Sequence, residues 1–230
     1  MSERKKLFLI FIFTFFNIFL IIGFLIINDA VNESNLKSEI RRLDSLEISE
    51  DRFNVTIKSR GDYEFVESAI KTYYDEYAMN LQAVLNILES DEFKRLLLID
   101  NLKKITSNYD DSFKYIKITR REFNKKIEIL ILMSDINEIK NNIFSYIDDE
   151  YYVDLYNDLM FNSRICTDII NNKDDLIKLK EQINNNLNLS EEILTFLIEN
   201  KSKWKIEEEE IKFDNKILLD KYNILISKLK

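Results

Sequence analysis

The chain has 230 residues, a formal net charge of −8, one Cys, two Gly, and neither His nor Pro. Without His and with a single Cys, the sequence excludes Ser-His-Asp and Cys-His catalytic sites, imidazole metal sites and thiolate zinc sites. The shortage of Gly and Pro argues against phosphate-cradling loops, strand-rich barrels and doubly wound folds, and it indicates long helices joined by short polar turns.

The first predicted element is a membrane-spanning helix at residues 7–27, with the sequence LFLIFIFTFFNIFLIIGFLII. This segment contains no charged residue. At ~1.5 Å per residue it is about 31 Å long, close to the thickness of the hydrocarbon core of a membrane. A cleaved signal peptide would have a shorter apolar stretch followed by small residues. Residues 26–29 (IIND) offer no such cleavage site, so we favour an uncleaved anchor over a cleaved signal.

Basic residues crowd the N-terminal flank of this segment, where Arg4, Lys5 and Lys6 stand, whereas the opposite flank carries Asp29. The positive-inside rule therefore places residues 1–6 in the cytoplasm and the domain that follows on the outer face of the membrane. No second apolar run is long enough to span a membrane, so we expect a single-pass protein. The charge from Asp29 onward is −10, which argues against nucleic acid as a partner.

Residues 28–60 are predicted to form a stalk followed by an extended segment. The stalk has apolar residues at positions 36, 40 and 43, which share one face of a short helix. From Phe53 to Ile57, apolar and polar residues alternate as in a strand. Gly61 and Asp62 are then expected to end the extended segment and to begin a helix.

Residues 61–230 are predicted to form a bundle of five or six helices, which makes the fold class mainly α. Apolar residues recur every three or four positions in the segments 62–88, 113–133, 136–147, 150–169, 174–200 and 214–229. Whether 174–200 is one helix or two stays open, and its Asn184-Asn185-Asn186 run favours a break. Segment 203–213 is either a small β-hairpin or a charged helix, and a hairpin there could pair with a strand at 52–57.

Three segments carry a resemblance to known proteins: GDYEFVESAIKTYYDEY (61–77), YIDDEYYVDLYNDLM (146–160) and the hairpin-like stretch from Trp204 to Phe213. They resemble a group of uncharacterised, membrane-anchored helical proteins of low-GC Gram-positive bacteria. The resemblance covers most of the part after the membrane segment, and it consists of aromatic and aliphatic packing residues. It implies a location in the cell envelope and no known activity. The group implies Asn-Gly-like residues at the hairpin turn, where this chain has Glu208 and Glu209.

A basic helical face is the first candidate for ligand binding. Lys114, Lys117, Arg121 and Lys125 recur at helical spacing, and such a face could hold phosphate-rich envelope polymers or lipid head groups. We favour the alternative, in which the face is solvated and pairs with neighbouring acidic helices.

Tyrosines at one-turn spacing are the second candidate. Tyr73 and Tyr77, and likewise Tyr152 and Tyr156, would line a groove for a sugar or a peptide. Aromatic stripes with this spacing more often belong to the core, and we favour that interpretation.

Carboxylate runs at 148–150, 174–175 and 207–210 lack the alternating spacing and the Gly of a calcium loop. Asp148 and Asp149 are better explained as the start of a helix, and Cys166 as a small core residue. We expect no metal, no cofactor and no catalytic residue. The function we favour is a non-enzymatic, membrane-anchored extracytoplasmic domain of the cell envelope that binds or scaffolds an envelope protein or polymer. The alternatives are a ligand-binding module for an envelope polymer, lipid head group or small molecule, and a carboxylate-dependent hydrolase.

Overall fold

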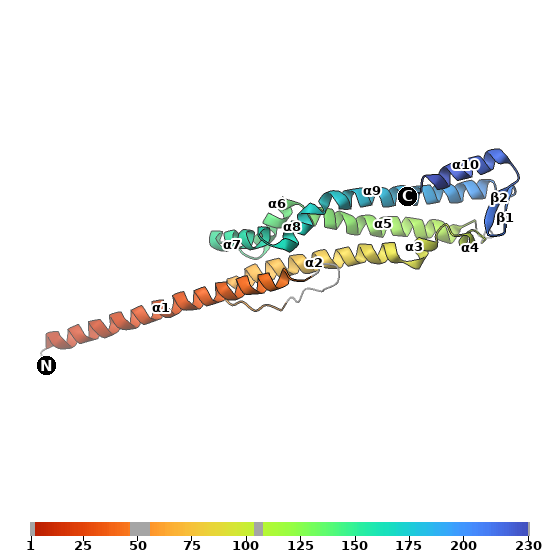
Figure 1. Cartoon of the computed structure of the whole chain (residues 1–230). Coiled ribbons are helices and arrows are strands. Elements are labelled where there is room, and N and C mark those ends of the chain that lie inside the picture. Colours follow the sequence, from red (N-terminus) through yellow and green to blue (C-terminus); the bar gives the residue numbers. More distant parts are fainter. Residues whose placement is uncertain (1–2, 47–55, 104–107, 230) are drawn as a thin grey trace. The chain divides into compact units, whose positions relative to one another are not determined.

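The computed structural model describes residues 3–46, 56–103 and 108–229 (Figure 1). These residues are mostly helical, and the sheet they contain is a two-stranded antiparallel hairpin. The fold class predicted from the sequence, a mainly α protein with a small β-hairpin, is therefore confirmed. The chain divides into two compact units. Unit 1 comprises Met1–Asp75 and Lys140–Thr167, and unit 2 comprises Glu76–Ile139 and Asp168–Lys230.

Unit 1 is built on α1 (Glu3–Leu43), one uninterrupted helix of 41 residues (Figure 1). The predicted membrane segment and the predicted stalk are parts of this same helix, because residues 24–43 contain no Gly or Pro that would break it. An i,i+4 ion pair between Glu33 and Lys37, at 2.6 Å, supports the helix beyond the apolar stretch. Three apolar side chains on one face of its last turns are buried against the rest of unit 1: Leu36, Ile40 and Leu43.

Shorter elements complete unit 1. They are the first part of α2 (Tyr63–Glu89), the end of α6 (Ile136–Asn142), the 3-10 turn η2 (Ile143–Ser145), α7 (Glu150–Phe161) and the start of α8 (Arg164–Asn171). The predicted helix start at Asp148 and Asp149 is confirmed, because the Asp149 side chain caps α7 by accepting a hydrogen bond from the Tyr151 N–H at 3.0 Å. Cys166 is fully buried, as expected, and burial raises the pKa of its thiol to about 12.

Unit 2 is built on two long helices, α5 (Asp110–Met133) and α9 (Lys173–Glu199). Ion pairs join Asp135 to Lys173, Glu128 to Lys180 and Arg120 to Glu191. Along these three pairs the residue number falls from 135 to 120 on the α5 side and rises from 173 to 191 on α9, so the two helices pack antiparallel. The second part of α2 also belongs to unit 2, with α3 (Asp91–Arg95), α4 (Ile99–Leu102) and α10 (Lys216–Ser227).

Segment 174–200, which the sequence leaves open as one helix or two, is one helix, because α9 runs unbroken through the three asparagines that favoured a break. Asn184 does not compete with the helix as a free polar side chain. Its amide exchanges two hydrogen bonds with the amide of Asn124 on α5, at 2.7 and 3.1 Å. Ser190, further along the same helix, donates its hydroxyl to the carbonyl of Asn186 at 2.8 Å.

The segment 203–213 is a hairpin rather than a charged helix. Strand β1 (Trp204–Glu207) pairs with β2 (Glu210–Phe213), and Glu208 and Glu209 form the two-residue turn with φ angles of 52° and 61°. Trp204 anchors the hairpin, since its indole N–H donates to the carbonyl of Leu197 at 2.8 Å. The expected strand at 52–57 falls largely outside the described residues, and its described part, residues 56–57, is not assigned to a strand.

Candidate functional site

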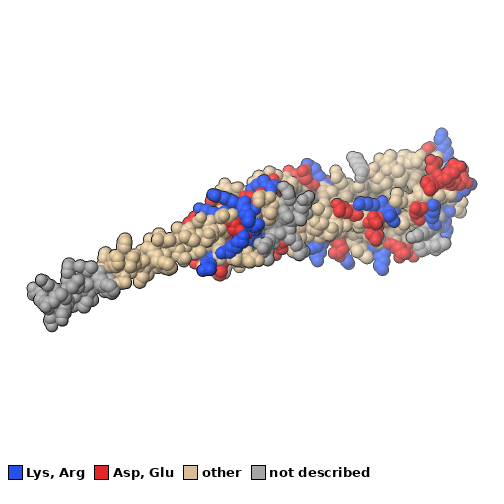
Figure 2. All heavy atoms as spheres, turned by 60° about the horizontal axis from the view of Figure 1, so that its bottom comes forward, with Lys and Arg blue, Asp and Glu red and all other residues tan. Residues whose placement is uncertain are grey.

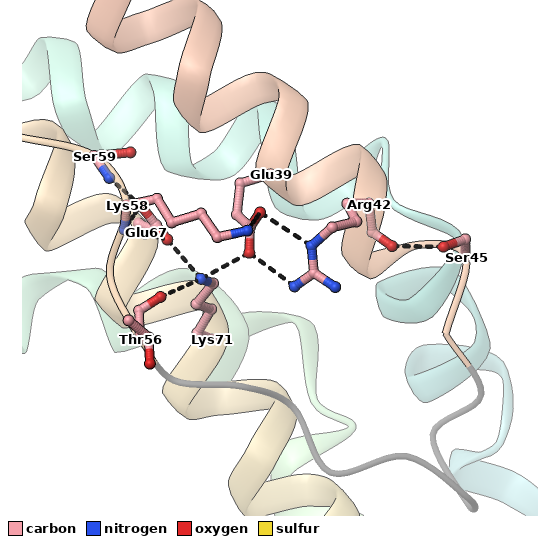
Figure 3. Close-up of polar contacts among 8 residues, drawn as sticks. All are labelled: Glu39, Arg42, Ser45, Thr56, Lys58, Ser59, Glu67 and Lys71. Carbon is pink, nitrogen blue, oxygen red and sulfur yellow. Dashed lines mark hydrogen bonds and ion pairs between the residues drawn. The ribbon is translucent and has the colours of Figure 1, made fainter.

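A network of charged side chains, here called the buried ion cluster, joins α1 to α2 inside unit 1 (Figure 3). Its members are Glu39 and Arg42 from α1, Glu67 and Lys71 from α2, and Lys58 from the segment before α2. The Nζ of Lys71 lies 2.6 Å from Oε1 of Glu67 and 2.9 Å from Oε1 of Glu39. One ammonium group therefore bridges carboxylates of two helices.

Hydrogen bonds satisfy the remaining polar atoms of the cluster. Glu39 pairs with Nζ of Lys58 at 2.6 Å and accepts two hydrogen bonds from the guanidinium of Arg42, at 2.8 and 3.0 Å. Glu67 accepts hydrogen bonds from the backbone N–H groups of Lys58 and Ser59. The third N–H of Lys71 is donated to the carbonyl of Thr56 at 2.7 Å, so the ammonium has a partner for every proton.

Because these charged groups are buried, each needs an oppositely charged partner inside the protein. Glu67 and Lys71 have no exposed surface, and Glu39 is 5% exposed. The hydrogen bond from Arg42 holds the pKa of Glu39 well below its usual value, against the effect of burial. Burial raises the pKa of Glu67, but hydrogen bonds from Lys71 and Ser59 outweigh it and leave that pKa lowered. Losing one partner of such a pair leaves an uncompensated buried charge and costs about 3–5 kcal/mol, so the cluster favours one alignment of α1 against α2.

Three tyrosines, here called the tyrosine cluster, gather beside α1 in the same unit: Tyr63, Tyr151 and Tyr152. The Tyr63 and Tyr152 rings meet edge to face with centroids 5.2 Å apart, and those of Tyr151 and Tyr152 at 5.1 Å. The Tyr63 hydroxyl donates to Oδ1 of Asp29 at 3.0 Å. Asp29 stands two residues beyond the predicted membrane segment, where tyrosine is enriched in membrane proteins.

An open groove of about 460 Å³ lies next to the tyrosine cluster. Its walls come from α1 (Leu25, Ile26, Asn28, Asp29, Asn32), from the start of α2 and the residues before it (Arg60, Gly61, Asp62, Tyr63), and from α7 (Tyr152). Arg60 is exposed, and no carboxylate within the described ranges forms an ion pair with it. The groove thus combines an apolar end, one cation and two carboxylates.

The predicted basic face lies on α5 in unit 2. Lys114, Lys117, Arg121 and Lys125 are all exposed, and Arg121 pairs with Glu122 at 2.8 Å. For the three lysines, no ion pair is formed with any residue that the structure describes. Acidic and basic side chains are interspersed on the molecular face in Figure 2, which agrees with a solvated surface.

The predicted tyrosines occupy different settings. Tyr73 and Tyr156 in unit 1, and Tyr77 in unit 2, are 6%, 0% and 2% exposed, and are core residues. Tyr152 is half-buried and lines the groove. Sequence reasoning missed Tyr63 and Arg60. The signal that could have found them is an arginine and a tyrosine at the start of α2, the helix that lies parallel to α1, with Tyr63 near Asp29 and Lys71 near Glu39.

Among the residues described, no group of three or more Cys, Asp or Glu side chains is arranged to hold a metal ion. Comparisons with protein-family models, with characterised proteins and with solved structures find no match to this chain. The buried ion cluster, the groove and α1 are therefore the features that bear on function.

Proposed function

We propose that the chain is a single-pass, membrane-anchored domain of the bacterial cell envelope, which acts outside the cytoplasm as a binding or scaffolding module without catalysis. The observation that carries the proposal is the continuity of α1. From Phe15 to Ile27 its described side chains are uncharged and mostly exposed, and its last turns bury Leu36, Ile40 and Leu43. In Figure 2 the narrow tan stretch beyond the grey atoms carries no Lys, Arg, Asp or Glu side chain.

The apolar part of α1 exposes large apolar side chains, which are more stable in lipid than in water. None of the span-length apolar window is buried within the structure, whereas an apolar core helix of a soluble protein would be mostly covered. The side chains exposed by about half or more are Phe15, Phe16, Phe19, Leu20, Ile21, Ile22, Phe24, Leu25, Ile26 and Ile27. A contiguous apolar surface of this kind marks an interaction with a membrane or a partner, and its length suits a membrane.

The continuity of α1 also supports a retained anchor over a cleaved signal. The same helix that carries the apolar stretch contributes Leu36, Ile40 and Leu43 to the core of unit 1 and Glu39 to the buried ion cluster. Because no loop separates the anchor from these contacts, unit 1 is held at the membrane by a rigid helix instead of a flexible tether. Such a mounting suits a scaffold that presents a surface at a fixed distance from the membrane.

The buried ion cluster bears on the hydrolase alternative. Glu39 and Glu67 are two buried carboxylates that share Lys71, whereas a carboxylate-dependent hydrolase needs two carboxyl groups that flank its substrate. The oxygens of Glu39 and Glu67 are occupied by Lys58, Arg42, Lys71 and backbone N–H groups, and Glu67 has no exposed surface. This arrangement supports a structural role for both carboxylates.

A second candidate function is the binding of a polyanionic envelope polymer to the basic face. The observation that favours it is a row of exposed lysines on α5, Lys114, Lys117 and Lys125, which spans about 16 Å and forms no ion pair within the described part of the chain. Replacing the three with Gln should weaken binding to an inorganic polyphosphate and flatten its salt dependence. Equal binding by the variant and the wild type would remove this candidate.

Cysteine labelling in intact cells tests the proposed topology. In a Cys166→Ser background, which removes the buried native thiol, single cysteines are introduced as Asp220→Cys on the exposed side of α10 and as Lys5→Cys before the apolar stretch. A membrane-impermeant maleimide should label the first variant in intact cells and the second only after lysis. The reverse pattern would overturn the orientation. Recovery of the wild-type chain in the soluble fraction without detergent would overturn the anchoring.

A further inference from the structure

The groove beside the tyrosine cluster lies at the depth where α1 leaves the membrane in the proposed topology. Its wall on α1 runs from Leu25 to Asn32, about 10 Å along the helix axis. The head-group layer on each side of the hydrocarbon core is about 5–8 Å thick. Leu25 and Ile26 therefore belong to the edge of the hydrocarbon, while the polar wall residues from Asn28 onward lie in the head-group layer.

The polar part of the groove carries charges of both signs. Arg60 is exposed and, among the described residues, has no carboxylate partner. Asp62 follows it closely in the chain, and Asp29 faces the same groove from α1. A guanidinium is well matched to a phosphodiester, whereas two carboxylates beside it repel a purely anionic head group and attract an ammonium.

We propose that this groove binds one phospholipid whose zwitterionic head group ends in a primary ammonium. Arg60 holds the phosphodiester, Asp62 and Asp29 accept N–H groups from the ammonium, and the acyl chains lie against Leu25 and Ile26. The proposal rests on the membrane anchoring proposed above, which brings lipid to the mouth of the groove. A quaternary ammonium has no N–H to donate, so it forms the charge contact but not the hydrogen bonds.

The tyrosine cluster gives the groove a fixed wall. Tyr63 and Tyr152 pack edge to face, and the Tyr63 hydroxyl occupies Oδ1 of Asp29 at 3.0 Å. That hydrogen bond orients the Asp29 carboxylate before any lipid arrives, which lowers the entropic cost of binding. Tyrosine itself favours this level of a membrane, because its ring is apolar and its hydroxyl is polar.

Native mass spectrometry of the full-length chain tests the proposal. The chain, in detergent micelles, is titrated with phosphatidylethanolamine, phosphatidylcholine and phosphatidylglycerol of identical acyl chains, and the retained lipid is counted. Wild type should retain one phosphatidylethanolamine about five-fold more tightly than either other lipid. Phosphatidylglycerol lacks the ammonium charge, worth about 1 kcal/mol near a membrane surface, and phosphatidylcholine lacks the N–H donors, whose hydrogen bonds are worth about 1 kcal/mol net. Arg60→Gln should lose retention of phosphatidylethanolamine by about five-fold. Asp62→Asn, which keeps a residue that can cap α2, should narrow the preference for phosphatidylethanolamine over phosphatidylcholine, because Asp29 is then the one carboxylate of the groove that accepts from the ammonium.

Arg41→Gln is the matched control, because Arg41 is exposed on α1 and lies about 18 Å along the helix from Asp29. It removes the same charge and should leave retention unchanged. Equal retention of the three lipids by wild type, tighter retention of phosphatidylglycerol, or equal losses in Arg41→Gln and Arg60→Gln would each overturn the proposal. Alkaline extraction of membranes reports on the anchor separately. A chain that stays in the membrane pellet but shows no lipid preference retains its anchor and lacks the proposed site.

Discussion

The ion pairs between long helices are buried in unit 1 and partly exposed in unit 2. In unit 1, Lys71 and Glu67 lie without exposed surface between α1 and α2. In unit 2, the ion pairs between α5 and α9 lie at the rim of the helix pair. The side chains of Arg120 and Glu191 are 30% and 46% exposed, and those of Lys180 and Glu128 are 33% and 60% exposed. Water can replace a lost partner in unit 2 but not in unit 1.

This difference teaches where the fold demands one alignment of its helices. Sliding α1 by one turn in either direction would replace Glu39 with Asn35 or Leu43. Lys71 would then keep one carboxylate instead of two, in a place that water does not reach. The rim pairs of unit 2 are partly solvated, so losing one of them costs little. The strict arrangement thus belongs to the unit that contains the proposed membrane anchor.

The largest expected effect comes from breaking the buried ion cluster at its centre. Lys71→Met keeps the length of the side chain but leaves Glu67 and Glu39 without the shared ammonium, and we expect a loss of about 3–5 kcal/mol in the free energy of unfolding. The measurement is thermal and urea unfolding of the full chain in detergent, followed by circular dichroism. Lys178→Met is the control, since Lys178 forms an exposed pair with Asp175, and it should cost less than about 0.5 kcal/mol. Similar losses in both variants would contradict the contrast between buried and exposed pairs.

Acid should weaken unit 1 through the same cluster. The pKa values of Glu39 and Glu67 are lowered from 4.5 in the folded chain, so their stabilisation is complete above about pH 4.5 and is lost as the pH falls through the lowered values. Each group contributes a slope of at most about 1.4 kcal/mol per pH unit. The urea midpoint should therefore fall between pH 5 and pH 3, and Glu39→Gln should show a shallower fall. Parallel pH profiles for variant and wild type would show that Glu39 does not drive the acid response.

Mutation of the hairpin turn, unlike mutation of the buried ion cluster, should raise the free energy of unfolding. Glu208 and Glu209 both adopt positive φ, which costs roughly 1–2 kcal/mol for an L-residue with a Cβ, and Asn-Gly suits the same turn. We expect the double change Glu208→Asn with Glu209→Gly to stabilise unit 2 by about 1 kcal/mol, or a few degrees in Tm. Changing both residues to Gln removes the same two charges and keeps the backbone strain. If the Gln variant gains as much, charge repulsion and not backbone conformation is the cause.

The same turn shows how far the sequence predicts the fold. Alternation around residues 204–213 predicts paired strands, but Glu-Glu is a poor turn by local preference, so the sequence alone leaves a charged helix open. Packing decides the outcome, because the Trp204 indole is fixed by the Leu197 carbonyl and Phe213 lies between Phe196 and Tyr222. These contacts bring distant residues together, and local patterns do not contain them.

The candidate site is less predictable for a related reason. Helical spacing identified the core tyrosines and the basic face, since both follow from the periodicity of one helix. The buried ion cluster depends on Glu39 meeting Lys71, 32 positions away, and Lys58 lies in a segment without helical periodicity. Glu39, Glu67 and Lys71 look like ordinary surface charges in the sequence. Only the pairing of α1 with α2 shows that they are buried.

The smallest expected effect concerns the partly exposed ion pairs between α5 and α9 in unit 2. A double-mutant cycle with Lys180→Ala and Glu128→Ala measures the coupling energy of a rim pair whose Nζ–Oε1 distance, 2.8 Å, is close to the 2.6 Å of the Lys71–Glu67 pair. Because both partners at the rim are partly solvated, we expect a coupling of about 0.2–1 kcal/mol that decreases in high salt. The Lys71–Glu67 cycle should give a much larger and nearly salt-independent coupling. Since the two distances are so similar, equal couplings would mean that separation, and not access to water, sets the strength of these pairs.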